Sequence, residues 1–245
     1  MTIPFLTAHW KNLIVVNYEV DPEALRARLP DGVELDLFEG RALISVVAFH
    51  FQDMRVAGII PAFPTRNFEE VNLRFYVKRR VRDEWRRGVV FVREIVPSRI
   101  VAVTARLLYS EPYYRLPMRH DFSAFDDTLG GTLSYSISHQ TPPVTIQATT
   151  TGDLISLNND AVASFILEHY WGYTRRRGGR TSEYRVAHPS WKIWRAQSLC
   201  VSPELTFLYP PEFSEALSRS PHSLCVAQGS DVSVYGYRAF SSTSS

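Results

Sequence analysis

The stretch EEVNLRFYVKRR, residues 69–80, alternates regularly between apolar and polar side chains. The apolar positions are Val71, Leu73, Phe75 and Val77, and the polar ones are Glu70, Asn72, Arg74, Tyr76 and Lys78. Successive side chains of a β-strand point to opposite faces of the sheet, so the alternation predicts a strand with one apolar and one polar face. The pattern by itself leaves open whether the polar face meets bulk water or the interior of a pocket.

Apolar runs of strand length recur along most of the chain. They predict a strand in residues 10–20, two strands joined at Glu39-Gly40, two strands separated by Pro97-Ser98, a hairpin around Pro142-Pro143, and a strand, turn and strand over residues 223–240. Residues 42–51 and 100–108 are apolar at nearly every position, which is typical of strands covered on both faces.

Three segments predict helices. Residues 21–30 begin with Asp21, which suits an N-cap, followed by a proline in the first turn. Residues 158–173 show apolar positions at helical spacing, with Asn158 or Asn159 as the cap. Residues 210–219 predict a second short helix.

The length of 245 residues fits one compact domain. We predict a mainly β, α+β domain over residues 1–240, and a disordered serine-rich tail over residues 241–245. Hydrophobic residues make up 45% of the chain and charged residues 21%, which is typical of a soluble globular protein.

Cellular location is predicted from what the chain lacks. Cys200 and Cys225 are its two cysteines, too few for a disulfide framework, which favours a reduced, cytoplasmic setting. No apolar run is long enough to cross a bilayer, and the N-terminal residues have no basic region or cleavage site typical of a signal peptide. We therefore expect a cytoplasmic protein with no membrane partner.

The usual catalytic and metal-binding signatures are missing. The sequence has no phosphate-binding glycine loop and no G-x-S-x-G elbow, and its histidines form no H-x-x-x-H pair. We therefore expect no metal and no cofactor. Arginines cluster at residues 79–87 and 175–180, but acidic residues dilute the first cluster and the formal net charge is only +2. Solvated loops explain both clusters better than a nucleic-acid partner does.

Several ordered motifs carry a resemblance to a known family. Residues 10–51 resemble the opening of the YqjF-like proteins that share the DUF2071 domain, and EEVNLRFYV resembles their E-x-N-x-R-x-Y-V strand. Residues 105–118 resemble an A-R-x-x-Y…P-Y-x-x-x-x-M segment. Residues 168–196 resemble an E-R-Y-x-x-Y…H-x-P-W segment, with Ser190 where the family often has proline. The resemblance runs from about Trp10 to about Cys225.

This family is similar in fold to acetoacetate decarboxylase, which implies a cone-shaped, mainly antiparallel β-barrel with a few flanking helices and a pocket in its mouth. In that enzyme a lysine forms a Schiff base with the substrate ketone. The three lysines of this chain are Lys11, Lys78 and Lys192, and none falls in residues 110–122, the segment matched to the lysine-bearing stretch. The resemblance therefore implies the pocket and disfavours the Schiff-base reaction.

With the family resemblance, the polar face of residues 69–80 is expected to look into the pocket. Arg74 would then bind a carboxylate, with Asn72 as a bridge between Glu70 and Arg74. Glu70 would be a general acid or base, and Tyr76 would orient the substrate or donate a proton.

Further candidates are weaker. Arg106 would be buried as a partner of Glu70 or as a second carboxylate anchor, while Tyr113 and His120 would line the pocket. His188 and Trp191 are expected to fix a tight turn.

Two functions stay open on this basis. One is an enzyme that uses acid–base chemistry on a small organic acid or carbonyl compound. The other is a non-catalytic protein that binds or senses the same kind of ligand. A homo-oligomer is compatible with both functions. A nucleic-acid-associated protein is a third and weaker hypothesis.

Overall fold

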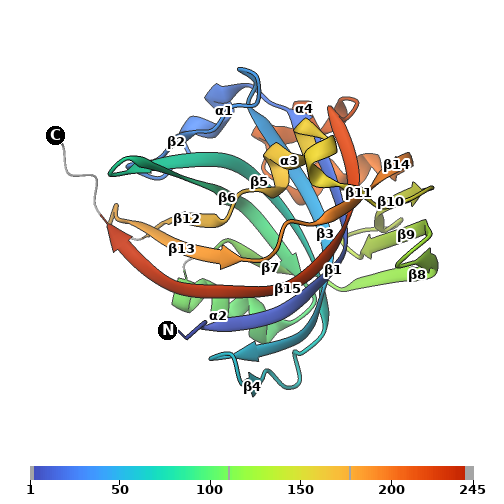
Figure 1. Ribbon diagram of the computed structural model, residues 1–245, viewed down its shortest axis with the longest axis horizontal. Coiled ribbons are helices and arrows are strands. Elements are labelled where there is room, and N and C mark those ends of the chain that lie inside the picture. The colour runs from blue at the N-terminus through green and yellow to red at the C-terminus, as the bar shows by residue number, and fades with distance from the viewer. Residues whose placement is uncertain (1–2, 110, 177, 241–245) are drawn as a thin grey trace.

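The computed structural model describes residues 3–109, 111–176 and 178–240, and most of them lie in β-strands (Figure 1). The predicted tail, residues 241–245, lies outside the described residues. In this part of the chain, no helix is long and apolar enough to cross a membrane.

Five long strands form the frame: β1 (Leu6–Glu19), β3 (Leu43–Val56), β5 (Phe68–Val81), β6 (Glu84–Val96) and β15 (Ser223–Phe240). Strands of intermediate length are β8 (Met118–Asp126), β9 (Gly130–Ile137), β10 (Val144–Thr150), β12 (Trp171–Arg175), β13 (Thr181–Ala187) and β14 (Lys192–Val201). Short strands at the edges are β2 (Glu34–Leu35), β4 (Ile60–Pro61), β7 (Tyr113–Arg115) and β11 (Ile155–Ser156).

The strands pair in the order β1-β3-β5-β6-β12-β13-β15, and β15 also pairs with β1. The sheet branches from β15 through β14 to β10, β9 and β8. Most pairs are antiparallel, but β12 and β7 both run parallel to β6. The fold is therefore mainly β, as predicted, but the expected antiparallel barrel is found as an uneven ring of mixed strand direction.

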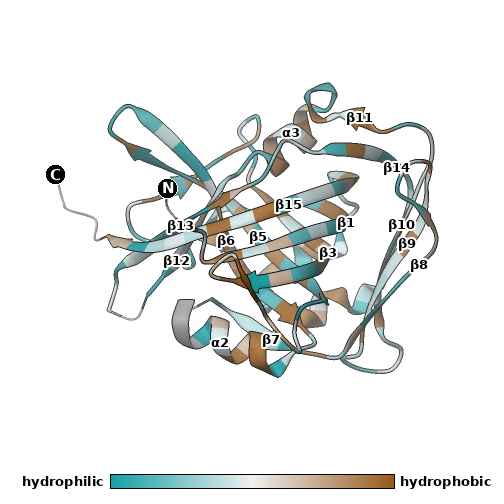
Figure 2. Cartoon of the chain, turned by 60° about the horizontal axis from the view of Figure 1, so that its bottom comes forward, coloured by the Kyte–Doolittle hydropathy of each residue, from teal (hydrophilic) through white to brown (hydrophobic). Residues whose placement is uncertain are grey.

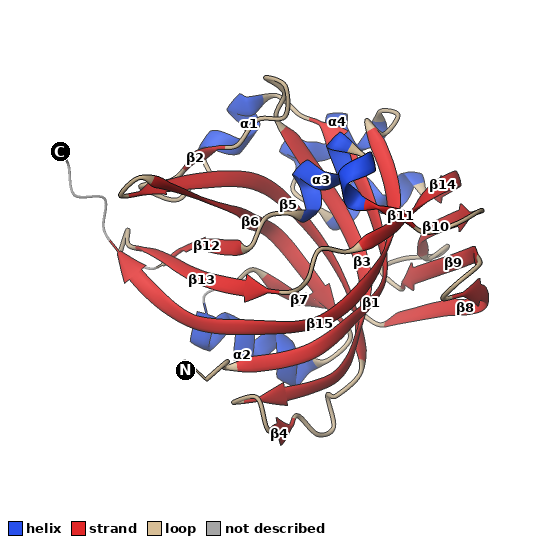
Figure 3. Cartoon of the chain, in the orientation of Figure 1, coloured by secondary structure: helices blue, strands red, loops and turns tan. Residues whose placement is uncertain are grey.

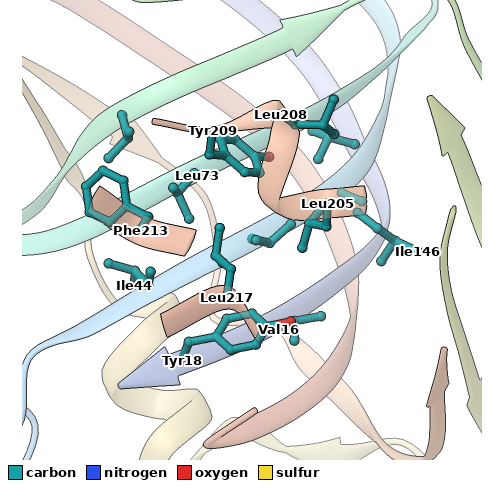
Figure 4. Close-up of a cluster of buried hydrophobic side chains, with 14 of the residues drawn as sticks. Val16, Tyr18, Ile44, Leu73, Ile146, Leu205, Leu208, Tyr209, Phe213 and Leu217 are labelled. Atoms are coloured by element: carbon teal, nitrogen blue, oxygen red, sulfur yellow. The ribbon is translucent and has the colours of Figure 1, made fainter. Parts of the chain in front are cut away.

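The alternation along β5 separates two sides of this ring. Val71, Leu73, Phe75 and Val77 are fully buried in a cluster outside the ring, whereas Tyr76 belongs to a second cluster on the opposite side. Figure 4 shows Leu73 in one cluster with Leu208, Tyr209 and Phe213, which follow β14 in the chain. Figure 2 shows how hydrophobic residues recur along β1, β5 and β15. The predicted two-faced strand is confirmed.

The helices are short and lie at two ends of the ring. They are α1 (Pro22–Arg26), α2 (Arg99–Tyr109), α3 (Ala161–Leu167) and α4 (Ser214–Ser218), with 3-10 turns at Leu157–Asn159, Pro203–Leu208 and Pro211–Phe213. In the view of Figure 3, α1, α3 and α4 lie at the top and α2 lies at the bottom. The Asp21 side chain accepts a hydrogen bond from the Glu23 N–H, so the predicted cap of α1 is confirmed.

The predicted strand over residues 100–108 is wrong, because these residues form α2. Ser98 caps this helix: its Oγ accepts from the Val101 N–H over 3.3 Å, and its carbonyl accepts from the Ala102 N–H over 3.1 Å. A serine after a proline thus begins a helix here, although the apolar run that follows is typical of a buried strand. Ala102 faces the interior, while Ile100 and Val103 are exposed.

Three other element boundaries differ from the prediction. The helix expected over residues 158–173 is only α3, capped by Asp160, and its second half becomes β12. The strand expected before Glu39-Gly40 shrinks to β2, which pairs with β5 rather than β3. The two strands expected over residues 223–240 are one strand, β15, with Gly229 at φ +79°. The hairpin around Pro142-Pro143 is confirmed as β9 and β10.

Candidate functional site

A cavity of about 370 Å³ opens inside the ring. Its walls come from the ring strands, from α2, and from the segment that carries β4. Aromatic side chains dominate the lining: Trp10, Phe49, Phe51, Phe68, Phe91, Trp171, Tyr184 and Trp191. The volume lies within the range of small-molecule sites, which reach from about 300 to 1,000 Å³.

The polar face of β5 supplies one wall of this cavity. Glu70, Asn72 and Arg74 all line it, and the Asn72 amide donates a hydrogen bond to Glu70 Oε1 over 3.0 Å. Glu70 and Asn72 are each only 2% exposed, whereas Arg74 is half-buried. These three residues therefore face the interior of the ring, as the family resemblance implied.

Tyr76 lies behind the wall rather than in it. Its hydroxyl and Ser45 Oγ are 2.5 Å apart, and the ring is almost fully buried. The His169 ring packs against it at 4.8 Å between centroids, and the Arg74 guanidinium lies 5.9 Å from its centroid. The Tyr76 ring thus packs against His169 and Arg74. Tyr76 is not among the residues that line the cavity, so its position does not support the expected contact with a substrate.

Arg74 makes no ion pair with a carboxylate among the residues that the structure describes, and the predicted Asn72 bridge is observed only on its Glu70 side. The Arg74 Nε atom is buried without a hydrogen-bond partner there. The positive charge still acts at longer range, because it lowers the pKa of the Glu70 carboxyl. A half-buried guanidinium therefore faces the cavity without a carboxylate of the described chain in ion-pair contact.

Three glutamates, Glu70 and two near it, gather in the cavity lining, and only Glu70 itself was predicted from the sequence. Glu94 and Glu111 also line the cavity and are 2% and 5% exposed. Burial raises the pKa of Glu70 and that of Glu111 to about 7 each, and it raises the pKa of Glu94 well above its usual range. The nearby Glu111 and Glu70 charges raise the pKa of Glu94 further. At neutral pH the cluster therefore retains protons.

Hydrogen bonds from hydroxyl groups hold this cluster in place. The Tyr113 hydroxyl donates to Glu70 Oε2 over 3.1 Å, and the Thr174 hydroxyl donates to Glu111 Oε1 over 2.5 Å. Tyr113 is brought there because β7 runs parallel to β6, with Tyr113 beside Glu94. The expectation that Tyr113 lines the cavity agrees with its position.

A β-bulge explains why Glu94 was missed. The register between β5 and β6 shifts between Leu73 and Arg74, so that Val92 is an extra residue. Phe91 and Glu94 then both face the cavity, although strict alternation would place them on opposite sides. Glu111 gave no periodic signal because it precedes β7 in a loop.

Two predicted site residues lie elsewhere. Arg106 is exposed on α2, where its guanidinium donates to the Tyr113 carbonyl and lies 5.0 Å from the Tyr114 ring centroid. Arg106 was expected to be buried because residues 100–108 were predicted to form a strand, which is instead α2. His120 is exposed on β8, where its Nδ1 is 2.8 Å from Glu69 Oε1. Neither side chain lines the cavity.

His169 and His188, neither of which was predicted to contact a ligand, line the cavity. His169 Nε2 is 3.1 Å from Asp36 Oδ2, and Arg87 Nε donates to the same oxygen over 2.6 Å. Burial lowers the pKa of His169 to about 4, so the imidazole is neutral at pH 7. His188 stacks on Trp191 at 4.1 Å between centroids, and both rings line the cavity, whereas the sequence predicted only a tight turn there.

All three lysines lie outside the cavity lining. Lys11 Nζ is 3.5 Å from Asp127, Lys78 Nζ is 3.4 Å from Glu34, and Lys192 is exposed. No group of three or more metal-ligating side chains is found within the described ranges. The polar groups that line the cavity therefore include one guanidinium, buried carboxyl groups, the Asn72 amide, phenols and imidazoles.

The fold is shared with solved enzyme structures. Acetoacetate decarboxylase from Legionella pneumophila superposes with a TM-score of 0.66 at 13% identity, over 97% of this chain and 87% of that one. The enduracididine biosynthesis enzyme MppR, complexed with pyruvate, gives a TM-score of 0.65 at 15% identity, over 98% and 91%. The protein thus has the acetoacetate-decarboxylase-like fold.

The family follows from the sequence. The model of DUF2071, a family described as uncharacterized conserved proteins, matches residues 7–231, and the chain belongs to this family. The protein YqjF of Bacillus subtilis (strain 168) is 31% identical over 113 residues. That alignment covers 46% of this chain and 45% of YqjF, so it spans less than half of the relative's length.

Proposed function

We propose that the cavity binds a small organic acid or carbonyl compound and acts on it by acid–base chemistry, without a Schiff-base lysine. The observation that carries this proposal is Arg74, whose half-buried guanidinium faces the cavity with no carboxylate partner in the described chain. A charge in such a place is stabilised by an ionic partner, and a ligand carboxylate fits a guanidinium in bidentate fashion.

The neighbouring glutamates favour this ligand over a cation. Three ionised carboxylates would repel an acid, but their raised pKa values keep protons on the cluster at neutral pH. A protonated carboxyl can donate a hydrogen bond to a carbonyl oxygen of the ligand. Arg74 would therefore hold the carboxylate while the glutamates meet the carbonyl.

Glu70 is the proposed acid–base group. Its pKa of about 7 makes both of its protonation states available near neutral pH, which is the condition for efficient general acid–base catalysis. In an enolisation it would remove a proton from the carbon next to the carbonyl, and a protonated carboxyl such as Glu94 would stabilise the enol oxygen. Ligands of this type occur in MppR, which has been solved with pyruvate and with a condensation product of pyruvate and imidazole 4-carboxaldehyde.

Binding is tested by calorimetry with matched pairs of carboxylates and their neutral amides. We expect the acids to bind at least tenfold more tightly than the amides, because the amides offer Arg74 no charge. Arg74→Met should remove this preference without unfolding the protein. The guanidinium is not paired with a carboxylate of the described chain, so its removal leaves no buried carboxylate unpaired. Arg195→Met, at an exposed position on β14, is the matched control and should keep the preference. Equal binding of acids and amides would contradict the proposal.

Turnover separates an enzyme from a binding protein. Proton NMR in deuterated buffer should show loss of the C3 proton signal of 2-oxo acids, and Glu70→Gln should abolish that loss. Tight binding without exchange would instead assign the cavity to ligand binding or sensing. Borohydride should trap no covalent adduct, and an adduct on Lys11, Lys78 or Lys192 would overturn the absence of Schiff-base chemistry.

A further inference from the structure

The cavity has an apolar mouth that an acid head group alone would leave exposed. Phe63 and Ile100 line the cavity and are 75% and 57% exposed, and Val56 in the same lining is 47% exposed. Ile60 and Val103, in the same two segments, are 59% and 52% exposed. These five residues, here called the mouth residues, lie on the segment around β4 and on α2, which both lie at the bottom of Figure 1. Large apolar side chains are seldom left in water as a cluster without a partner.

Another part of the cavity lining, here called the aromatic wall, is also apolar and is already packed. Trp10 contacts Phe49 at 5.1 Å, Phe51 at 5.7 Å and Trp191 at 6.3 Å between ring centroids. Phe51 in turn stacks on Phe68 at 4.6 Å. Rings that hold one another in this way cannot collapse into the cavity, so the space stays open for a ligand.

The size of the cavity exceeds what a short acid needs. A cavity of about 150 Å³ lined by apolar side chains is enough to hold benzene. The present cavity measures about 370 Å³, so it has room for a carboxylate and carbonyl at the polar end together with a benzene-sized group. A two- or three-carbon acid at Arg74 would leave most of the aromatic wall uncovered.

We infer that the ligand is amphipathic: an organic acid whose carboxylate meets Arg74 and whose alkyl or aryl body runs along the aromatic wall to the mouth residues. This inference rests on the proposed function, since it takes the acid-binding end from it. It adds the class of substrate, which is a medium-chain or aryl-substituted acid rather than a short one such as pyruvate.

Calorimetry with butanoate, hexanoate and octanoate tests the inference at a fixed head group. Each buried methylene contributes about 0.8 kcal/mol, so the affinity should rise about fourfold per methylene until the chain reaches the mouth. Phe63→Ser and Ile100→Ser should weaken octanoate binding by tenfold or more while leaving butanoate unchanged. Both positions are exposed, so these variants are expected to fold. Leu129→Ser and Phe207→Ser, also at exposed apolar positions but outside the cavity lining, are the controls and should bind octanoate normally.

The outcomes distinguish this inference from the function on which it depends. If none of the acids binds, the proposed function fails and the inference fails with it. If all the acids bind with equal affinity, the proposed function stands and the inference is overturned. If the mouth variants lose binding to phosphatidylcholine vesicles, or lose self-association, while octanoate binding is unaffected, the mouth serves a surface or a second copy and the inference is also overturned.

Discussion

The Tyr113 hydroxyl donates a hydrogen bond to Glu70 Oε2 over 3.1 Å and thereby links β7 to β5 across the carboxyl cluster. The bond lowers the pKa of Glu70 against the larger, opposing effect of burial. Tyr113→Phe removes the donor and keeps the ring. We expect the Glu70 pKa to rise above about 7 and the free energy of unfolding to fall by about 1–2 kcal/mol. Carbon-13 NMR of the Glu70 carboxyl and urea denaturation measure the two effects, and an unchanged Glu70 pKa would contradict the assignment.

The raised pKa values of Glu70 and Glu111 predict a loss of stability with rising pH. Each carboxyl has a pKa of about 7 in the folded protein, against a usual value of 4.5. The folded state therefore binds more protons, and the stability present below pH 4.5 is lost as the pH rises through 7. The slope is about 1.4 kcal/mol per pH unit for each group.

Urea denaturation between pH 5 and pH 8 measures this loss. Glu70→Gln should flatten the pH dependence, because glutamine cannot ionise. Glu215→Gln, at an exposed position on α4, should leave the dependence as in the wild type. A Glu70→Gln variant with the full wild-type slope would show that Glu70 is not the buried acid inferred here.

His169 predicts a pH dependence of the opposite sign. Burial lowers its pKa to about 4 from a usual value of 6.5, so the unfolded chain binds the extra proton between these values. The stability that neutral His169 provides is present above pH 6.5 and is lost as the pH falls toward 4. In His169→Gln this acid loss should be smaller, measured by thermal unfolding at pH 4.5 and pH 7. Equal acid losses in both proteins would contradict a depressed pKa.

Gly172 keeps space for Tyr184 beside Glu111. A Cβ at position 172 would lie 2.0 Å from Tyr184 Cζ, so Gly172→Ala must displace that ring from the cavity wall. We expect the free energy of unfolding to fall by about 1–3 kcal/mol through overpacking, and ligand affinity to fall with it. Gly236→Ala is the matched control, because nothing lies within 4 Å of a Cβ there. Wild-type stability in Gly172→Ala would show that Tyr184 can shift away from position 172 at no cost in folding free energy.

The arginine clusters are predicted not to bind nucleic acid specifically. Arg79 and Arg86 both pair with Glu183, at 2.8 Å and 2.7 Å, so part of the first cluster is neutralised within the protein. Fluorescence anisotropy with DNA and RNA oligonucleotides should show no submicromolar affinity that falls steeply with salt. Such binding, if it disappeared when Arg175, Arg176 and Arg177 were changed to serine, would support a nucleic-acid-associated function; Arg177 lies outside the described residues.

The sequence alone determined those features that depend on local periodicity and local hydrogen bonds. The alternation in β5 placed Glu70, Asn72 and Arg74 on one face, since a strand has a period of two residues regardless of its neighbours. The Asp21 cap of α1 likewise depends only on residues next to it. The choice of which β5 face looks inward came from the family resemblance, because alternation only sets the two faces against each other.

The tertiary structure decided what depends on register and on distant segments. A bulge between β5 and β6 turned Glu94 into the cavity, and no periodic pattern encodes where a bulge falls. His169 meets Asp36 across 133 positions of the chain, so their hydrogen bond has no local signal. Residues 99–109 have an apolar run that is typical of a strand, but they form α2, which begins at the Ser98 cap and leaves Ile100 and Val103 exposed. The tertiary structure brings Glu70, Glu94 and Glu111 from separate segments into the lining of one cavity. Burial there raises the pKa of each carboxyl, and the sequence alone does not define that burial.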